Sequence, residues 1–118
     1  MYSETVLDHY RHPRNVGEIA NADAAVEATN PVCGDRLRLW VSVHEERVVD
    51  AKFRVEGCIP AVACASWLTG WIIGKSPAEL ASVNTSDVET AIGGLPSASR
   101  HAAALAVSGL QQVLEKIG

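Results

Sequence analysis

Apolar and polar side chains alternate along two neighbouring stretches in the middle of the chain. The apolar positions are Leu37, Leu39, Val41 and Val43 in the first stretch, and Val49, Ala51, Phe53 and Val55 in the second. A period of two over this length is typical of strands that bury one face. Glu45, Glu46 and Arg47 lie between the two runs. The pattern therefore predicts a β-hairpin with one buried face.

Helices are predicted before and after this hairpin. Ser3 is a good N-cap for a short helix that reaches about Tyr10, and Pro13 ends it. The longest apolar stretch runs from Ala61 to Ile73, and it is interrupted by Ser66, Thr69 and Gly70. It is too short to span a bilayer, so it predicts a buried helix.

Two capping boxes and an amphipathic stripe predict three more helices. Ser76 to Glu79 opens a short helix, and Ser86 to Glu89 opens another that ends at Gly93-Gly94. The last helix is predicted to start near residues 97–99 and to run to the C-terminus. Its apolar stripe comprises Ala106, Leu110, Val113, Leu114 and Ile117.

The order of these elements predicts an α+β fold. Asn21 to Asn30 is ambiguous and is assigned as an edge strand, which gives a small antiparallel sheet of about three strands with helices packed on one face. With 118 residues, 47% hydrophobic and 20% charged, the chain suits a single domain over residues 1–118. Such a core needs neither disulfides nor a metal in order to fold.

Composition and charge narrow the function classes. The net charge is −4 and the basic residues are scattered, which argues against nucleic-acid binding. The polar, charged segment from Met1 to Arg14 does not resemble a signal peptide, and no stretch suits a membrane span. We therefore expect a cytoplasmic protein. Three cysteines in that compartment predict free thiols or metal ligation rather than a disulfide framework.

The candidate chemistry gathers around this hairpin. Cys33 and Asp35 precede its first strand, and Cys58 follows its second. Because a hairpin returns the chain to its starting end, Cys33 and Cys58 should lie at the same end of the sheet. His101 lies in the first turns of the last helix, and Cys64 adds a third thiol in the predicted buried helix. Thiolates suit iron–sulfur clusters, Zn²⁺ and Cu(I), and imidazole or carboxylate can complete such a site.

Each of these residues also has an ordinary structural explanation. A cysteine in an apolar helix, such as Cys64, is commonly a small core residue. His101 could be a solvated helix residue, and an aspartate that follows glycine, as Asp35 does, is common in turns. Spacing alone therefore leaves both a metal site and a purely structural interpretation open.

Ordered motifs resemble those of the IscU/NifU-type iron–sulfur cluster scaffold family. The matching segments are Tyr2-Ser3-Glu4, Asp8-His9-Tyr10, residues 13–17 (PRNVG), Cys33-Gly34-Asp35, Gly57-Cys58 with Ala61, Trp71 with Gly74-Lys75-Ser76, and Leu95-Pro96 with His101. They follow the family's order and spacing from residue 2 to about residue 101. The combination is specific, whereas the CGD motif alone would be weak.

The resemblance implies a cluster scaffold or carrier with a defined ligand set. In the family, three cysteines and a nearby His or Asp hold a nascent [2Fe–2S] cluster or a zinc ion. A cysteine desulfurase supplies sulfur as persulfide, and apo iron–sulfur proteins receive the cluster. By this match, Cys33, Cys58 and His101 are ligands of the cluster, iron or zinc, and Asp35 is a metal-binding carboxylate or the one that keeps the cluster labile.

The chain also departs from the family pattern. Ala102 stands where the family's third cysteine follows the histidine, which puts sulfur acceptance in question. Ser99 replaces the lysine of the LPPVK motif, which argues against docking of a dedicated chaperone. Ile59-Pro60 replaces the small residues after the second cysteine. Cys64 occupies a family Ser or Ala position, so it is a candidate replacement thiol or metal ligand.

Three functions remain open at this stage. The first is a scaffold or carrier for an iron–sulfur cluster or its metal. The second is a zinc-binding or regulatory module that has lost sulfur acceptance. The third is a Cys–His enzyme that uses Cys58 or Cys33 with His101. We rank the enzyme last, since no orienting group or substrate pocket is apparent. The prediction is therefore a binding protein and not an enzyme.

Overall fold

A computed structural model describes the whole chain, residues 1–118. Five α-helices, three strands and one 3₁₀ turn follow one another along it. They are α1 (Glu4–Arg11), β1 (Ala24–Thr29), β2 (Arg36–His44), β3 (Arg47–Glu56), α2 (Ile59–Ile72), α3 (Pro77–Leu80), α4 (Thr85–Ala91), η1 (Ser97–Ser99) and α5 (His101–Ile117). None of the helices is both long and apolar enough to cross a membrane.

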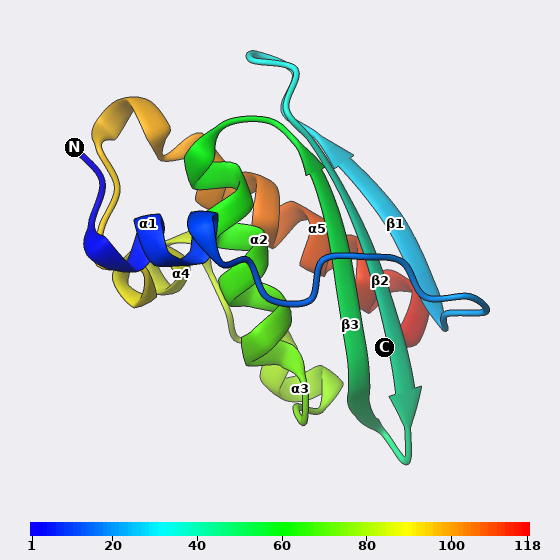
Figure 1. Cartoon of the computed structure of the whole chain (residues 1–118). Coiled ribbons are helices and arrows are strands. Elements are labelled where there is room, and N and C mark those ends of the chain that lie inside the picture. The colour runs from blue at the N-terminus through cyan, green and yellow to red at the C-terminus, as the bar shows by residue number, and fades with distance from the viewer.

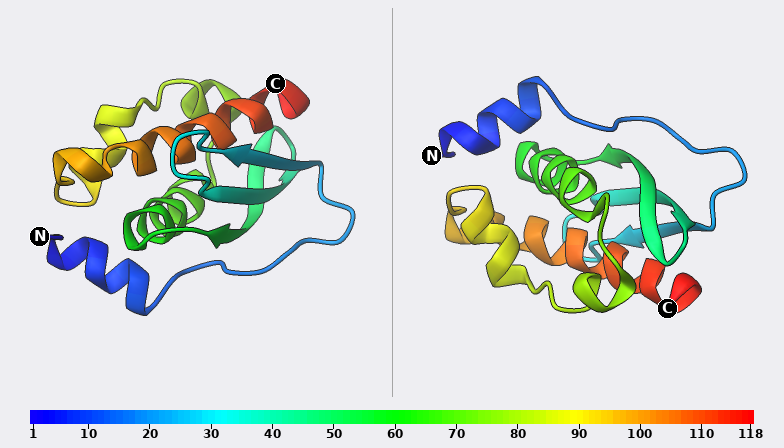
Figure 2. Two further views of the ribbon diagram at one scale, coloured as in Figure 1. Left: turned by 90° about the horizontal axis from the view of Figure 1, so that it is seen from above. Right: turned by 90° about the horizontal axis from the view of Figure 1, so that it is seen from below.

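The three strands form one antiparallel sheet in the order β1-β2-β3. Helices α2 and α5 cover one face, and the segment between α1 and β1 runs along the other side (Figures 1 and 2). The α+β fold with helices on one face of a three-stranded antiparallel sheet is therefore confirmed. The ambiguous segment at residues 21–30 contains the edge strand β1.

One prediction about the hairpin is wrong. Val49 was assigned to the buried face, but its side chain is 53% exposed, and Val48 is buried in its place. The register shifts between Ser42 and Val43, so that Ser42 faces Asp50 whereas Val43 faces Val48. The extra residue is a β-bulge, and one inserted residue reverses the side on which every following side chain lies.

Helix caps mostly agree with the sequence, with one correction. Ser3 accepts a hydrogen bond from the Val6 amide, and Ser76 and Glu79 form the predicted capping box. The box of α4, however, is formed by Asn84 and Asp87, so this helix begins before Ser86. Asn is as good an N-cap as Ser. Both possible boxes, Asn84 with Asp87 and Ser86 with Glu89, place an acidic residue at the third helical position.

A single core cluster of 26 buried residues joins the sheet to the helices. Its largest side chains include Phe53, Leu37 and Leu39 from the sheet, Leu68 from α2 and Leu110 from α5. Gly109 of α5 lies against the sheet, where an added Cβ would come within 2.9 Å of Leu37 Cδ2. The absence of a side chain there lets α5 approach β2 closely. This packing sets the position of the start of α5 relative to the end of the sheet.

A buried hydroxyl holds α1 and the following loop against α2. Ser66 is 0% exposed; its Oγ accepts a hydrogen bond from the Arg14 amide at 2.9 Å and lies 2.7 Å from His9 Nδ1. With His9 neutral, the Ser66 hydroxyl donates to Nδ1. Burial, and then the charge of Arg14, lower the pKa of His9 below its usual value of 6.5.

We expect acid to weaken this attachment. Because the folded-state pKa of His9 lies below its unfolded value, its stabilising contribution is complete above pH about 6.5 and is lost as the pH falls toward the folded pKa. The free energy of urea unfolding, measured from pH 7.5 to 5.5, should fall more steeply in the natural chain than in His9→Gln. Equal slopes in the two proteins would contradict this role of His9.

Candidate metal centre

The sheet brings two cysteine-bearing segments to one end of the molecule. Arg36 at the start of β2 pairs with Glu56 at the end of β3. Cys33 precedes the first of these residues and Cys58 follows the second. The turn before β2 is held by hydrogen bonds between Gly34 N and Asn30 O and between Asn30 N and Asp35 O, both 2.8 Å long. Gly34 has φ +79°, which glycine adopts without strain.

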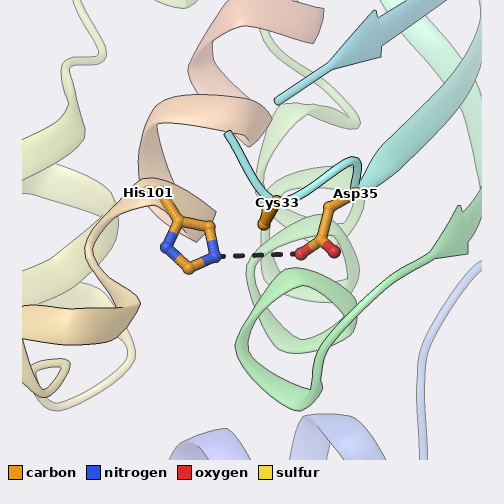
Figure 3. A group of neighbouring side chains, drawn as sticks. All are labelled: Cys33, Asp35 and His101. Atoms are coloured by element: carbon orange, nitrogen blue, oxygen red, sulfur yellow. Dashed lines mark ion pairs between the residues drawn. The ribbon is translucent and has the colours of Figure 1, made fainter. Parts of the chain in front are cut away.

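Helix α5 supplies an imidazole to the same place. Cys33, Asp35 and His101 each offer a ligand atom, and these atoms lie within 4.8 Å of one another. Figure 3 shows the three side chains pointing toward a common point, with the Nε2 of His101 3.8 Å from Oδ2 of Asp35. Cys33 is exposed, His101 is partly exposed and Asp35 is 9% exposed. The group therefore lies at the surface but rests on a buried carboxylate.

Cys58, the N-cap residue of α2, lies beside this group and contacts two of its members, Asp35 and His101. Its Sγ donates to Asp35 Oδ2 at 3.1 Å and lies 3.8 Å from His101 Nε2. Its backbone N–H also points to Asp35 Oδ2, at 3.4 Å. The structure thus brings together two thiols, one carboxylate and one imidazole from three separate segments of the chain.

The charges of this group depend on Asp35. Burial alone would raise the pKa of its carboxyl, but hydrogen bonds from Cys58 and Cys33 and the nearby His101 outweigh burial and lower the pKa. The pKa of the Cys58 thiol is raised, first by burial and then by the adjacent Asp35 carboxylate. In the metal-free protein, the charged Asp35 carboxylate therefore accepts a hydrogen bond from the protonated Cys58 thiol. A cation that binds here would displace that proton.

Gly57 makes room for this carboxylate. A Cβ placed on Gly57 would lie 2.7 Å from Cγ and 3.0 Å from Oδ2 of Asp35. Any side chain there would have to move Asp35 away from Cys58. The sequence analysis named Gly57 only as part of the Gly57-Cys58 motif and predicted no separate role for it.

The start of α5 is anchored by an ion pair next to the site. Both carboxylate oxygens of Glu89 on α4 accept from Arg100, at 2.8 and 3.3 Å. Arg100 immediately precedes His101, so this pair restrains the end of the helix that carries the imidazole. Ala102, the next residue, is 1% exposed and offers no nucleophile.

Cys64 lies in the hydrophobic core, at 0% exposure. Burial, followed by the nearby Cys58 and Glu89, raises the pKa of its thiol to about 12. A thiol ligates metal as the thiolate, and at neutral pH this thiol holds its proton. The sequence left open whether the Cys64 thiol faces the site or the core, and in the structure it is buried in the core.

We therefore expect Cys64→Ser to reduce stability and leave metal binding unchanged. A serine hydroxyl without a partner in this core should cost about 1–3 kcal/mol of unfolding free energy. Chemical denaturation of the metal-free protein and metal stoichiometry are to be measured on the same variant. Cys64→Ala is the matched control, because it removes the thiol without introducing a hydroxyl. Loss of bound metal in both variants would show instead that Cys64 is a ligand.

Comparison with known proteins places these features in a family. The model of the NifU-like N-terminal domain matches residues 1–117. The chain is 39% identical to the iron–sulfur cluster assembly scaffold protein IscU 1 of Archaeoglobus fulgidus, over 97% of this chain and 74% of that protein. It is 36% identical to the scaffold protein IscU of Escherichia coli, over 96% of this chain and 91% of that one.

Solved structures agree. A crystal structure from Fervidobacterium islandicum, described as that of a candidate iron–sulfur cluster assembly scaffold protein for the SUF system, superposes with a TM-score of 0.78. The two chains are 25% identical, and the match covers 96% of each. The N-terminal part of a NifU-like protein from Brucella abortus has the same fold, with a TM-score of 0.74. The two chains are 17% identical, and the match covers 98% of this chain and 90% of that one. This chain belongs to the NifU-like N-terminal domain family.

Proposed function

We propose that this chain is an iron–sulfur cluster assembly scaffold. In this proposal, Cys33, Cys58 and His101 hold a nascent [2Fe–2S] cluster, or the iron from which it is built, beside the Asp35 carboxylate. The observation that carries the proposal is the convergence of these side chains at one accessible end of the sheet. Relatives that match most of the chain are named as such scaffolds.

The donor set fits this cargo. Thiolate sulfur and imidazole nitrogen are common ligands of iron in clusters, and a carboxylate oxygen exchanges more readily. Asp35 contacts Cys58 and lies near His101, so its carboxylate oxygen can compete with them for a ligand position. Zinc suits the same donors. We therefore include Zn²⁺ as a second occupant of this site.

Partners follow from the same proposal. A cysteine desulfurase would supply sulfur, and apo iron–sulfur proteins would accept the cluster. Ser99 in η1 replaces the lysine expected of a chaperone-binding motif, so we do not include a dedicated chaperone. A cytoplasmic location stays a prediction.

The geometry argues against a Cys–His enzyme. In a nucleophilic triad, the carboxylate holds the imidazole nitrogen that faces away from the nucleophile. Here Asp35 and Cys58 both lie 3.8 Å from the same nitrogen, Nε2 of His101. The pKa of the Cys58 thiol is also raised, whereas an activated nucleophile needs it lowered. A non-catalytic binding role is the simpler account of the group.

The test is anaerobic isolation of the protein without added chelator, followed by iron, zinc and acid-labile sulfide analysis and a visible spectrum. The proposal expects iron with sulfide, and visible absorption after reconstitution. Cys33→Ala, Cys58→Ala and His101→Ala should each lower occupancy. His44→Ala, at the exposed far end of the hairpin, is the matched control. Zinc without cluster formation under any of these conditions would favour the zinc-binding module instead.

A further inference from the structure

Most of the outer edge of β3 is already paired. Val48 at one end exchanges backbone hydrogen bonds with Gly74 and Lys75, 2.7 and 3.0 Å long. Farther along, Phe53 N donates to Asn15 O at 2.9 Å, and Phe53 O accepts from Gly17 N at 3.0 Å. The segment after α1 therefore forms a short parallel bridge with this edge. Between these two points, the Ala51 amide is covered by its neighbour's side chain, Asp50 Oδ1, at 2.9 Å.

Val55 has neither kind of partner. In an antiparallel pair, residues alternate between those that bond the partner strand and those whose N–H and C=O point away from it. Phe53 points away, since it bonds Asn15 and Gly17, so Val55, two residues further, points away as well. No backbone hydrogen bond outside the regular elements reaches Val55. In Figure 1 the N-terminal segment crosses β3 short of the strand's carboxyl-terminal end. An unpaired donor and acceptor thus remain at the site end of this edge.

A groove of about 380 Å³ lies at this position. Its aliphatic wall is formed by Pro13 and Val16 from the N-terminal segment, Val55 of β3 and Val62 of α2. Val16 is 49% exposed, so part of this aliphatic wall is open to solvent. Open strand edges next to aliphatic pockets bind extended peptides, because main-chain hydrogen bonds supply affinity and the pockets receive alternate side chains.

Charge indicates what such a peptide carries. Arg38, Arg54 and Glu56 also line the groove, and the two arginines face each other directly across β2 and β3. Glu56 is paired with Arg36, at 2.6 Å, and Glu27, which lies opposite Arg38 on β1, is also nearest to Arg36, at 4.0 Å. Like charges at this position repel. Arg54 is neutralised by Glu18, at 3.1 Å, whereas Arg38 has no carboxylate within 4.0 Å and its guanidinium lies 5.8 Å from the centre of the Trp40 ring. A carboxylate from outside would relieve this repulsion.

We propose that the edge of β3 at Val55, with the groove beside it, binds an extended peptide segment of a partner protein. The segment pairs with the Val55 backbone, places an aliphatic side chain between Val16 and Val62, and directs an acidic side chain to Arg38. Val55 lies just before Cys58 in the chain, so the bound segment would end beside the metal centre. The segment could bring a donor or acceptor cysteine to the cluster, and this role rests on the proposed function. The binding of the peptide to the edge of β3 does not depend on it.

The test uses the metal-free full chain, labelled for amide NMR, so that a failure of cluster binding does not affect it. The probe is a synthetic peptide of alternating valine and threonine with one central glutamate. We expect it to shift the Val55 amide and its neighbours. Arg38→Glu should weaken binding about tenfold, since a rim ion pair becomes a repulsion. Lys116→Glu makes the same change of charge at the end of α5 and should have no effect.

Two altered peptides separate the contributions. Replacing the glutamate by lysine should weaken binding to the natural chain by a similar factor, about tenfold, and restore it to Arg38→Glu. N-methylation of the peptide amides beside the glutamate removes main-chain donors and should abolish binding. The proposal is overturned if millimolar peptide leaves Val55 unshifted, if N-methylation has no effect, or if the edge proves to be covered by a second copy of this chain in solution.

Discussion

Asp35→Ala is expected to lengthen the lifetime of the bound cluster, not to abolish its assembly. Asp35 Oδ2 lies 3.1 Å from Cys58 Sγ and 3.8 Å from His101 Nε2. A carboxylate at this point competes as an exchangeable oxygen ligand. It also repels an anionic thiolate-bound cluster, because its lowered pKa keeps it charged at neutral pH.

The size of this effect follows from Coulomb's law. Two unit charges about 4 Å apart interact with about 4 kcal/mol at an effective dielectric constant near 20. Even a third of that repulsion, about 1.4 kcal/mol, would change a rate about tenfold. We therefore expect the cluster in Asp35→Ala to decay at least about tenfold more slowly than in the natural chain.

The measurement is the decay of visible absorption after anaerobic reconstitution and addition of a chelator. Asp35→Asn keeps the size of the side chain and removes its charge, so it separates repulsion from packing. Asp50→Ala removes a carboxylate near the opposite end of β3 and should change nothing. A folded Asp35→Ala protein that fails to assemble any cluster would make Asp35 an essential ligand and would refute its role in release.

Gly57 offers a second route to the same carboxylate. In Gly57→Ala, the new Cβ would meet Asp35 Cγ at 2.7 Å, so the carboxylate must move away. The change should lengthen the lifetime of the cluster in the natural background and add nothing in Asp35→Ala. An equal effect in both backgrounds would show that Gly57 acts independently of Asp35.

Ala102→Cys is expected to increase persulfide formation severalfold. The natural residue follows His101 in the first turn of α5 and has no nucleophile. Ala102 directly follows His101, so the new thiol would lie in the same helical turn as the imidazole of the site.

Ala102 is 1% exposed, so its labelling must be compared with that of a freely accessible cysteine on the same helix. Ala104→Cys places a thiol on the exposed side of the same helix, so it measures transfer to any accessible cysteine. Labelled sulfur from a cysteine desulfurase should accumulate more on Ala102→Cys than on either Ala104→Cys or the natural chain. Equal labelling of the two variants would mean that proximity to the site contributes nothing.

Much of the site could be predicted because the hairpin is a local structure. The alternation in residues 36–44 and 49–56 predicted two antiparallel strands, and antiparallel strands necessarily bring Cys33 and Cys58 to one end. The caps at Ser3 and Ser76 were equally local, since each depends on residues within one turn. The CGD motif and the ordered matches then indicated the family, which the comparisons confirm.

Other features were beyond any local pattern. The bulge that exposes Val49 follows from the register of β3 against β2, and a period of two carries no mark of one inserted residue. The sequence also did not show that Asn84 rather than Ser86 caps α4, because both residues are good N-caps.

The sequence by itself determined the type of fold, the pairing of the two strands and the kinds of ligand atom that the chain can offer. Only the tertiary structure decided how those atoms meet. Asp35 and Cys58 bond across 23 positions and Cys58 approaches His101 across 43, while Cys64 lies in the core. Periodicity and capping report on neighbours within a few residues, whereas these contacts depend on how α2 and α5 pack on the sheet, which the whole core determines at once.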